Sequence, residues 1–503
     1  MHSIFETPEL ISMICADLPP CLMLVSKQFF HGILPYHWNQ TAMRNLFMRG
    51  LIPATWTRRD GKIHASTSQT LTPENMARFH FYAPFIKVLF FDSPLEIEDW
   101  DPLITYSQKI KLLPNLVTLE CWEPDLQVLS MSLSDSTRII HFSQHPISLT
   151  RNTLAFIASR CSTIRELCLH PMASKQDVVH LTVEDIPQQL FTPISEFREL
   201  RTLSTNTAVL QSHALKLISQ LPNLVDLHIS DGFLLGARPN LRLSHALPAN
   251  AFPSLRTLRI VLDTFQDVKR FWDLIPLKML SEVCISIKSA SSNDQAQFIP
   301  SLCHGSPQIR GLSLTFPSES GDGNLYSIQA DMFECLRNLP LDRFFSVSCA
   351  KLDFENAWDQ VAASWPLLGD IRCTDQPARV QDLMMLSTKL PSLSSVRCDF
   401  DLTHMASVIE RGWQPIGDPT RYSKLEQLIV IRLVELQELA SESSPYDLYD
   451  LAKFFAYFWP NANFRAPIYG NGPIGDDERV YQNELFDMFT NLIETHAHSF
   501  RNS

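Results

Sequence analysis

A glycine motif near the end of the 503-residue chain has the spacing of a phosphate-binding loop. Gly470, Gly472 and Gly475 match the pattern G-x-G-x-x-G, which binds dinucleotides when it joins the first strand of a βαβ unit to a helix. Here Pro473 lies inside the motif, and we predict no second strand after the helix that follows. We therefore expect no nucleotide site.

Two other groups have residue types that could support catalysis or metal binding. His496 and His498 lie one residue apart near the end of the sequence, where exposed histidines are more common than metal ligands. Cys303 and His304 are neighbours, which alone cannot make them a nucleophile and its base, so we expect a buried thiol. Because no G-x-S-x-G, H-E-x-x-H or Walker phrase occurs, we expect no enzyme, no catalytic residue, no metal and no cofactor.

Composition narrows the class of protein. A formal net charge of -12 argues against a nucleic-acid partner, because such proteins need an excess of Lys and Arg to neutralise phosphates. The hydrophobic content of 45% excludes a disordered chain. The 11 cysteines include no Cys-x-x-Cys pair, which favours free thiols in a reducing compartment over a zinc cluster or disulfides. With acidic residues near the start and no apolar run of about 18 residues, we expect a cytoplasmic or nuclear protein and no membrane partner.

A recurring phrase supplies the elements that would position a binding surface. Each copy has an apolar residue, two variable positions, another apolar residue, one variable position and usually a third apolar residue. The copies are LPNLVTLEC (113–121), CSTIRELCL (161–169), FRELRTLST (197–205), LPNLVDLHI (221–229), FPSLRTLRI (252–260), LKMLSEVCI (277–285), SPQIRGLSL (306–314), WPLLGDIRC (365–373), LPSLSSVRC (390–398) and YSKLEQLIV (422–430).

The spacing of the phrase indicates leucine-rich repeats. The marker residues, which are the apolar residues that precede each predicted strand by two positions, are Leu116, Ile164, Leu200, Leu224, Leu255, Leu280, Ile309, Leu368, Leu393 and Leu425. Two long steps each hold an extra unit, at Ile140 and at LPLDRFF (339–345), and FIKVLFF (85–91) is a plausible first unit. With these units included, the period is 24 to 36 residues, which is typical of irregular leucine-rich repeats.

The flanking residues agree with an α/β repeat. Helical runs precede many of the strands, at 214–221, 298–303, 332–339, 357–365, 382–390 and 448–459. Proline recurs between helix and strand, at Pro114, Pro222, Pro253, Pro307, Pro366 and Pro391, where it ends a helix without disturbing the ladder that follows. An ordinary α/β domain is the alternative, but it predicts glycine-rich loops and no repeated spacing. We therefore predict a leucine-rich-repeat solenoid of horseshoe type, closed by a helix over 476–496.

Alternation along each strand selects the residues that face outward. The outward positions that we expect to contact a target protein are Trp122, His170, His228, Arg259, Arg372 and Arg397. Arg259, Arg372 and Arg397 occupy the same position of the phrase, so we expect them in one column. Aligned arginines would suit an acidic or phosphorylated segment of a partner, although exposed strand positions are often charged for solubility alone.

The first forty residues differ from the repeats. Pro8, Glu9 and Leu10 open a short helical run, and the pair Pro19 and Pro20 must end it. A second apolar run covers 22–30, and a third segment ends at 38. Three small helices with apolar residues on more than one face cannot bury that surface alone, so we expect a partner to cover part of it.

At these residues the chain resembles the F-box, the motif by which adaptors dock onto the Skp1 subunit of SCF ubiquitin ligases. The matching residues are Pro8-Glu9-Leu10, Leu24-Val25-Ser26-Lys27 with Phe29, and Pro35 with Trp38, and the chain is similar to fungal F-box proteins with leucine-rich repeats. The resemblance implies contacts with a Skp1-like protein, and through it a cullin ligase, from Pro8, Leu10, Ile14, Leu24, Val25, Phe29 and Trp38. Only Leu18 to Cys21 separate the first two helical runs, fewer residues than the family normally has.

The resemblance and the repeats together predict a division of labour along the chain. We expect an F-box-like helical segment at 1–45, a linker at 46–78, irregular leucine-rich repeats at 79–467, and a cap helix and tail at 468–503. The implied function is a substrate-recognition adaptor of an SCF-type ligase, with an unknown target protein bound by the repeats. The alternative is a non-catalytic scaffold whose degenerate F-box does not bind Skp1 and caps the array.

Overall fold

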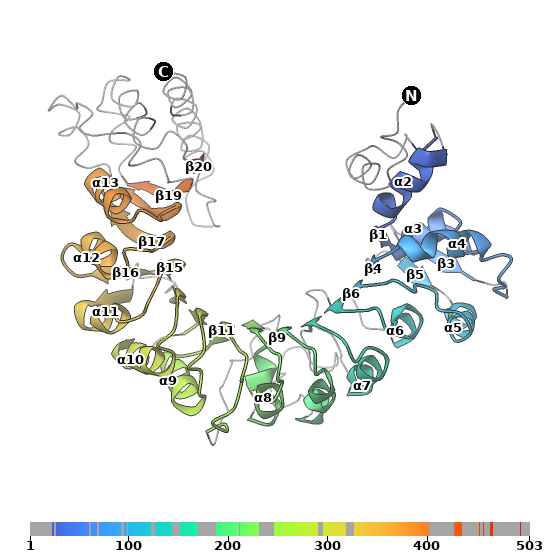
Figure 1. Ribbon diagram of the computed structural model, residues 1–503, viewed down its shortest axis with the longest axis horizontal. Helices are drawn as coiled ribbons and strands as arrows, with labels where there is room; N and C mark the ends of the chain where they lie inside the picture. The colour runs from blue at the N-terminus through green and yellow to red at the C-terminus, as the bar shows by residue number, and fades with distance from the viewer. Residues whose placement is uncertain are drawn as a thin grey trace. The chain divides into compact units, whose positions relative to one another are not determined.

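The computed structural model describes most of the chain between residues 23 and 401, and a few residues beyond. The described residues are 23–24, 27–59, 62–67, 70–91, 95–97, 99–121, 126–142, 151–169, 188–210, 212–230, 246–289, 295–317, 326–401, 427–434, 452, 456, 463–465 and 493. They belong to two compact units, residues 1–255 and 256–503, and each unit is described by itself (Figure 1).

The first unit is built on a parallel sheet. Its strands follow one another in the order β1 (Gln40–Ala42), β4 (Val88–Phe91), β6 (Thr118–Cys121), β7 (Ile139–Phe142), β8 (Glu166–Cys168), β9 (Thr202–Asn206) and β10 (Asp226–Ser230). All of these neighbours pair in parallel. Because parallel neighbours need a crossover connection, each step along the sheet adds one connecting segment.

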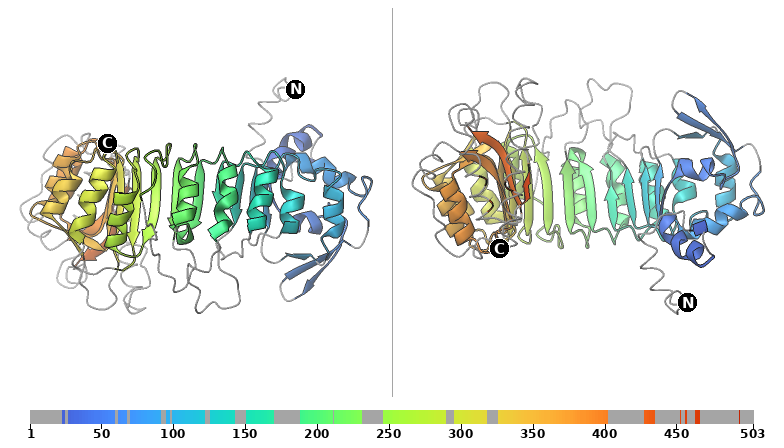
Figure 2. Two further views of the ribbon diagram at one scale, coloured as in Figure 1. Left: turned by 90° about the horizontal axis from the view of Figure 1, so that it is seen from below. Right: turned by 90° about the horizontal axis from the view of Figure 1, so that it is seen from above.

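Helices cover one face of this sheet. The described helices of the first unit are α2 (Lys27–His37), α3 (Met43–Met48), α4 (Ala77–Tyr82), α5 (Asp101–Ser107), α6 (Leu126–Ser132), α7 (Arg151–Arg160) and α8 (Ser212–Ser219), with 3-10 segments η3 (Ala83–Phe85), η5 (Gln188–Glu196) and η6 (Thr207–Leu210). In Figures 1 and 2, α5, α6, α7 and α8 follow one another along the sheet, and η5 packs between α7 and α8. The other face of the strands carries none of these helices.

Residues 46–78 differ from the linker that the sequence predicted. They contain β2 (Thr55–Arg59) and β3 (Lys62–Ser66), which form an antiparallel pair, and β5 (Leu95–Ile97) extends that pair in parallel. Leu51, Ala65 and Met76 are buried within this segment. The apolar residues within and beside the polar stretch 58–72 are therefore buried in the first unit, and residues 46–78 are part of its fold.

The second unit repeats the same arrangement. Its parallel strands follow the order β11 (Thr257–Leu262), β12 (Glu282–Ile287), β13 (Gly311–Thr315), β15 (Phe344–Ser348), β17 (Asp370–Ala378), β18 (Ser395–Asp401), β19 (Gln427–Val434) and β20 (Asn463–Arg465). The described helices are α9 (Phe265–Leu274), α10 (Gln295–Gly305), α11 (Ala330–Leu336), α12 (Ala357–Ser364) and α13 (Val380–Lys389), and they line one face (Figure 1). A separate parallel pair joins β14 (Tyr326–Gln329) to β16 (Ala350–Asp353).

The α9 helix shows how the sequence starts one of these outer elements. Thr264 precedes the helix and accepts a hydrogen bond at Oγ1 from the backbone N–H of Asp267 at 3.1 Å. The Asp267 carboxylate accepts one in return from the Thr264 N–H at 3.2 Å, which completes a capping box. Phe265, Val268 and Trp272 then recur at helical spacing and are buried. The sequence analysis predicted no helix here, although the capping residues were a usable signal.

The predicted strand register is confirmed for the described repeats. Every described strand that follows one of the ten markers begins two residues after it, and β4 begins two residues after Ile86. In the two extra units, Ile140 lies within β7, and the segment 339–345 ends within β15. Of the ten markers, nine are described, and each is at most 3% exposed. The tenth, Leu425, and the predicted helix and cap after 448 lie outside the described residues. The chain is therefore an α/β protein whose parallel sheet grows by one strand for each repeat.

The phrase also encodes hydrogen bonds between neighbouring repeats. In the first unit, a polar side chain beside the marker donates to a backbone carbonyl in the preceding turn. The pairs are Asn115 Nδ2 to Pro84 O at 2.9 Å, Ser136 Oγ to Pro114 O at 2.8 Å, Asn223 Nδ2 to Arg198 O at 2.8 Å and Ser254 Oγ to Pro222 O at 2.6 Å. Since a turn leaves backbone carbonyls without ladder partners, these side chains join each turn to the one before it.

Candidate functional site

The N-terminal helix is held to the first unit by residues near its end. Trp38, just after α2, is 6% exposed. Its ring lies 4.7 Å from that of Tyr82, and the Arg49 guanidinium stands 5.0 Å from its centroid. The resemblance implies that Trp38 contacts a partner, and in the structure its side chain packs inside this chain, where it anchors the end of α2. Ile33 and Leu34, also buried, add to that anchor.

Several large apolar side chains near this helix stay exposed. Leu24 is 90% exposed, Tyr36 is 41% exposed and Phe81 on α4 is 45% exposed. Phe30, from α2, stacks on Phe81 with ring centroids 6.2 Å apart. Of the other residues expected to contact Skp1, Phe29 is half-buried on α2, and Pro8, Leu10, Ile14 and Val25 lie outside the described residues.

The helix-free face of the first unit carries an acidic and histidine-containing row. Strand register aligns Glu120, His141, Cys168, Ser204 and His228 in one column. His141 Nε2 lies 3.0 Å from Glu166 Oε1, and its Nδ1 lies 4.0 Å from Glu120 Oε1.

Of the three target-contact residues predicted in this unit, one is described. His228 is exposed, and its Nδ1 lies 3.3 Å from Ser204 Oγ. Trp122 and His170 lie outside the described residues. His141, which the sequence analysis missed, follows Ile140 by one position, so the register of the extra repeat would have identified it.

The arginine column of the second unit is confirmed. Register pairs Arg259 with Cys284, then Ser313, Ser346, Arg372 and finally Arg397, one residue from each of β11, β12, β13, β15, β17 and β18. Arg259 is exposed, whereas Arg372 and Arg397 are half-buried. The three positions between the arginines hold small side chains, which the sequence analysis did not single out.

Arg372 is oriented by an acidic neighbour two residues earlier. Its Nε and Nη2 both donate to Asp370 Oδ2, the first at 2.9 Å. This hydrogen bonding raises the pKa of Arg372 above its usual value, although burial opposes the effect. Burial raises the pKa of Cys284, while the guanidinium groups of Arg259 and Arg372 both act to lower it. The two arginines therefore lie within electrostatic range of the same thiol.

Two polar atoms beside this cluster are buried without a hydrogen bond. Within the described part of the chain, neither Asp370 Oδ1 nor Ser395 Oγ has a partner. Ser395 is 8% exposed and pairs in register with Asp370. Buried polar atoms are normally hydrogen-bonded. Two neighbouring buried oxygens without partners therefore mark a place where a water molecule or a ligand can form the missing hydrogen bonds.

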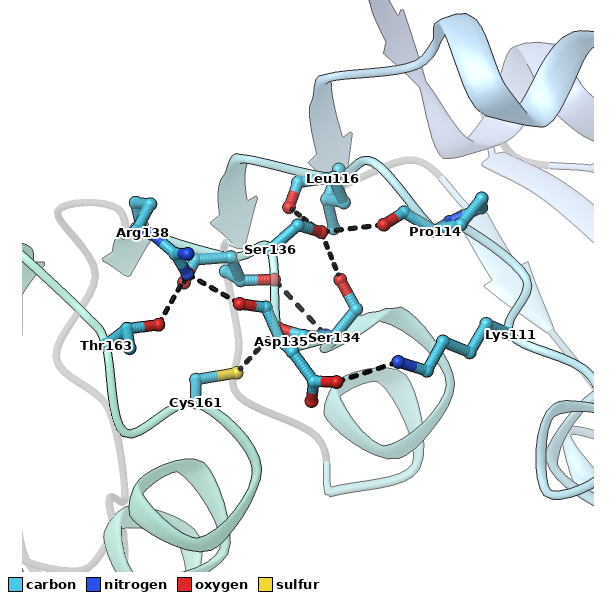
Figure 3. A network of polar contacts seen from close by, with 10 residues as sticks. Lys111, Pro114, Leu116, Ser134, Asp135, Ser136, Arg138, Cys161 and Thr163 are labelled. Carbon is cyan, nitrogen blue, oxygen red and sulfur yellow. Dashed lines mark hydrogen bonds and ion pairs between the residues drawn. The ribbon is translucent and has the colours of Figure 1, made fainter.

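A polar network on the turn side of the first unit has a structural role (Figure 3). Arg138 Nη1 donates to Asp135 O at 2.6 Å and to Thr163 Oγ1 at 2.5 Å, and Lys111 Nζ donates to an Asp135 carboxylate oxygen at 2.8 Å. A cavity of about 50 Å³ lies beside it, lined in part by Lys111, Asp135 and Arg160. Helices α5, α6 and α7 end beside this cavity. Lys111 and Arg160 therefore lie near helix C-termini, where the negative end of the helix dipole favours a positive charge.

The described residues also include potential metal ligands and free cysteines. Among them, no three or more His, Cys, Asp or Glu side chains are placed to hold a metal ion. Burial raises the pKa of Cys161 to about 11 and those of Cys303 and Cys373 to about 12, which disfavours the reactive thiolate. No helix in this part of the chain combines the length and apolar character needed to cross a bilayer.

Comparisons with known proteins leave the family open. No protein-family model matches the chain, and no curated protein matches it. Among solved structures, the chain is similar to one described as "Crystal structure of TLR13-ssRNA13 complex", with 14% identity and a TM-score of 0.32. The match covers 74% of this chain and 50% of that one, so this chain spans about half the length of that structure's chain.

Proposed function

We propose that this protein is a leucine-rich-repeat substrate adaptor of an SCF-type ubiquitin ligase. In this proposal, the N-terminal segment docks a Skp1-like protein, and the helix-free strand faces bind the target. The observation that carries the proposal is the contrast between the two sides of α2. Trp38, just after the helix, is buried against Tyr82, whereas Leu24, three residues before it, is 90% exposed. A helix anchored at its end and preceded by an exposed apolar side chain is suited to dock a second protein.

The repeats support the second half of the proposal. Each strand adds outward-facing side chains to a face that the described helices leave uncovered, and arrays of this kind bind proteins along such extended surfaces. The adaptor itself carries out no bond chemistry. It raises the local concentration of target lysines near the ubiquitin carrier, which is an effect of proximity.

Co-purification with a Skp1-like protein tests the docking half. The full chain is expressed with tagged Skp1, alongside a Leu24→Asp and Val25→Asp double variant and a Leu126→Asp control. Leu126 on α6 is 42% exposed, so the control adds a negative charge at an exposed leucine elsewhere in the first unit. We expect Skp1 to retain the wild type and the control and to lose the double variant. Absence of Skp1 binding by the wild type would refute the adaptor proposal.

That negative result would favour the scaffold with a degenerate F-box. One observation supports this second candidate, because Trp38, a residue matched to the motif, is used to pack α2 against Tyr82 of the same chain. The scaffold keeps the target-binding strand faces and predicts that the Leu24→Asp and Val25→Asp double variant binds its partners as well as the wild type does. Pull-downs that compare these two full-length proteins would show this.

A further inference from the structure

We propose that the helix-free face of β11–β18 binds an extended, carboxylate-rich peptide segment of a partner protein. Arg259 binds one end of the segment, and Arg372 and Arg397 bind the other. This inference rests on the proposed role of the repeats in target selection and adds the chemistry of the target.

The floor between the arginines leaves room for a peptide backbone. Cys284, Ser313 and Ser346 occupy the column between them, and Ser286, Thr315 and Ser348 form the next outward column. All of these side chains are short, and five of the six carry hydroxyls that can donate to or accept from peptide groups. A chain that crosses the strands here meets hydrogen-bonding groups and no bulky side chain in these two columns.

The spacing of the arginines sets the length of the segment. Arg259 and Arg372 are four strand steps apart in the register, which at about 4.8 Å for each step separates their backbones by about 19 Å. An extended peptide rises about 3.3 Å per residue, so about six residues span this distance.

The charges of the cluster favour carboxylates over phosphates. Asp370 occupies Nε and Nη2 of Arg372 through one oxygen, which leaves the Nη1 donors for an incoming anion. The same Asp370 places a negative charge beside the site, which repels a phosphate carrying nearly two charges more than it repels a carboxylate. Its buried Oδ1, without a partner among the described residues, needs a donor, which a backbone N–H of a bound peptide can supply.

Arg259 provides the most direct test because it can be changed without breaking a contact. It is exposed and makes no hydrogen bond or ion pair with the other described residues. Arg337, just after α11 on the helix side, is a control with a side chain that is 52% exposed and that forms an exposed ion pair with Glu334 at 2.7 Å. Because exposed ion pairs contribute little to stability, its substitution should leave the fold intact. Arg372→Gln is a second variant, although it removes the partner of Asp370 and its folding must be checked by circular dichroism.

Fluorescence polarisation with labelled ten-residue peptides measures the binding. The probe alternates Asp with Ser, so that in an extended chain all carboxylates project to one side. The matched peptides alternate Asn with Ser, and Asn with phosphoserine. We expect the Asp peptide to bind the full wild-type chain at 50 mM salt and the Asn peptide not to bind. Arg259→Gln weakens binding about tenfold, the loss expected for one charged hydrogen bond, and Arg337→Gln leaves it unchanged.

Three outcomes would overturn the inference. They are absence of binding by the Asp peptide, equal binding of the Asp and Asn peptides, and equal affinity of wild type and Arg259→Gln. Tighter binding of the phosphoserine peptide than of the Asp peptide would overturn the carboxylate assignment. Because the measurement uses no Skp1, its failure is distinguishable from failure of the docking half of the proposed function.

Discussion

Two adjacent leucines provide a sharp test of the repeat register. Leu368 is a marker with 0% exposure, and Leu367 before it is 62% exposed. Truncation of Leu368 to Ala removes a fully buried side chain, which costs about 2 to 3 kcal/mol in transfer free energy, and the cavity left behind adds about 1 to 2 kcal/mol. We expect Leu368→Ala to lower the free energy of unfolding by about 3 to 5 kcal/mol, and Leu367→Ala to change it by less than about 0.5 kcal/mol.

Urea unfolding followed by far-UV circular dichroism measures this difference, and hydrogen exchange locates it. Repeats contact their immediate neighbours, so the loss of protection from exchange in Leu368→Ala should concentrate in β15, β17 and β18. A loss spread evenly over the strands of both units would contradict the picture of independent neighbouring repeats. Equal destabilisation by Leu367→Ala and Leu368→Ala would refute the register itself.

Three further predictions concern the turns, the N-terminal helix and the thiols. Asn223→Ala should destabilise the first unit by about 1 kcal/mol in urea unfolding, because it removes the hydrogen bond to Arg198 O, while Asn223→Ser should recover part of the loss. Trp38→Ala should make α2 a site of rapid proteolysis while leaving exchange protection at β9 intact, because Trp38 anchors that helix. Cys373 should react with a disulfide reagent only on unfolding at pH 8, because a pKa of about 12 leaves roughly one thiol in ten thousand ionised.

The strands could be predicted from the sequence because each one has the same short pattern of apolar residues. Burial on one face dictates an apolar marker two positions before the strand and alternating apolar residues within it. This pattern placed β6 and every strand from β8 to β13. The arginine column followed from the same register, since residues at equal phrase positions must stack in a parallel sheet. Local rules therefore suffice where the fold repeats.

The features of the fold and of the candidate site that the sequence did not predict depend on contacts between residues far apart in the chain, which no local sequence pattern encodes. Residues 46–78 look polar, yet Leu51 and Met76 are buried because the first unit packs against them. Trp38 matches a docking motif but contacts Tyr82, a residue 44 positions later. The orientation of Arg372 by Asp370 likewise depends on side-chain geometry, which the sequence spacing alone cannot determine.

The hydrogen bonds between turns explain why repeats of 24 to 36 residues can share one sheet. Arg201 O accepts from the N–H groups of Val225 and Asp226, and Arg165 O accepts in the same way from Arg201 and Thr202. These bonds and the turn side chains involve only residues from just before the marker to the end of the strand. Among the described residues of these repeats, the segments between one strand of the large sheet and the next marker form one further parallel ladder, β14 with β16. The length of the helical segment can therefore vary without changing the register of the large sheet. A parallel sheet thus tolerates irregular repeats as long as the short phrase around each marker is intact, and the outward columns that bind a partner stay aligned.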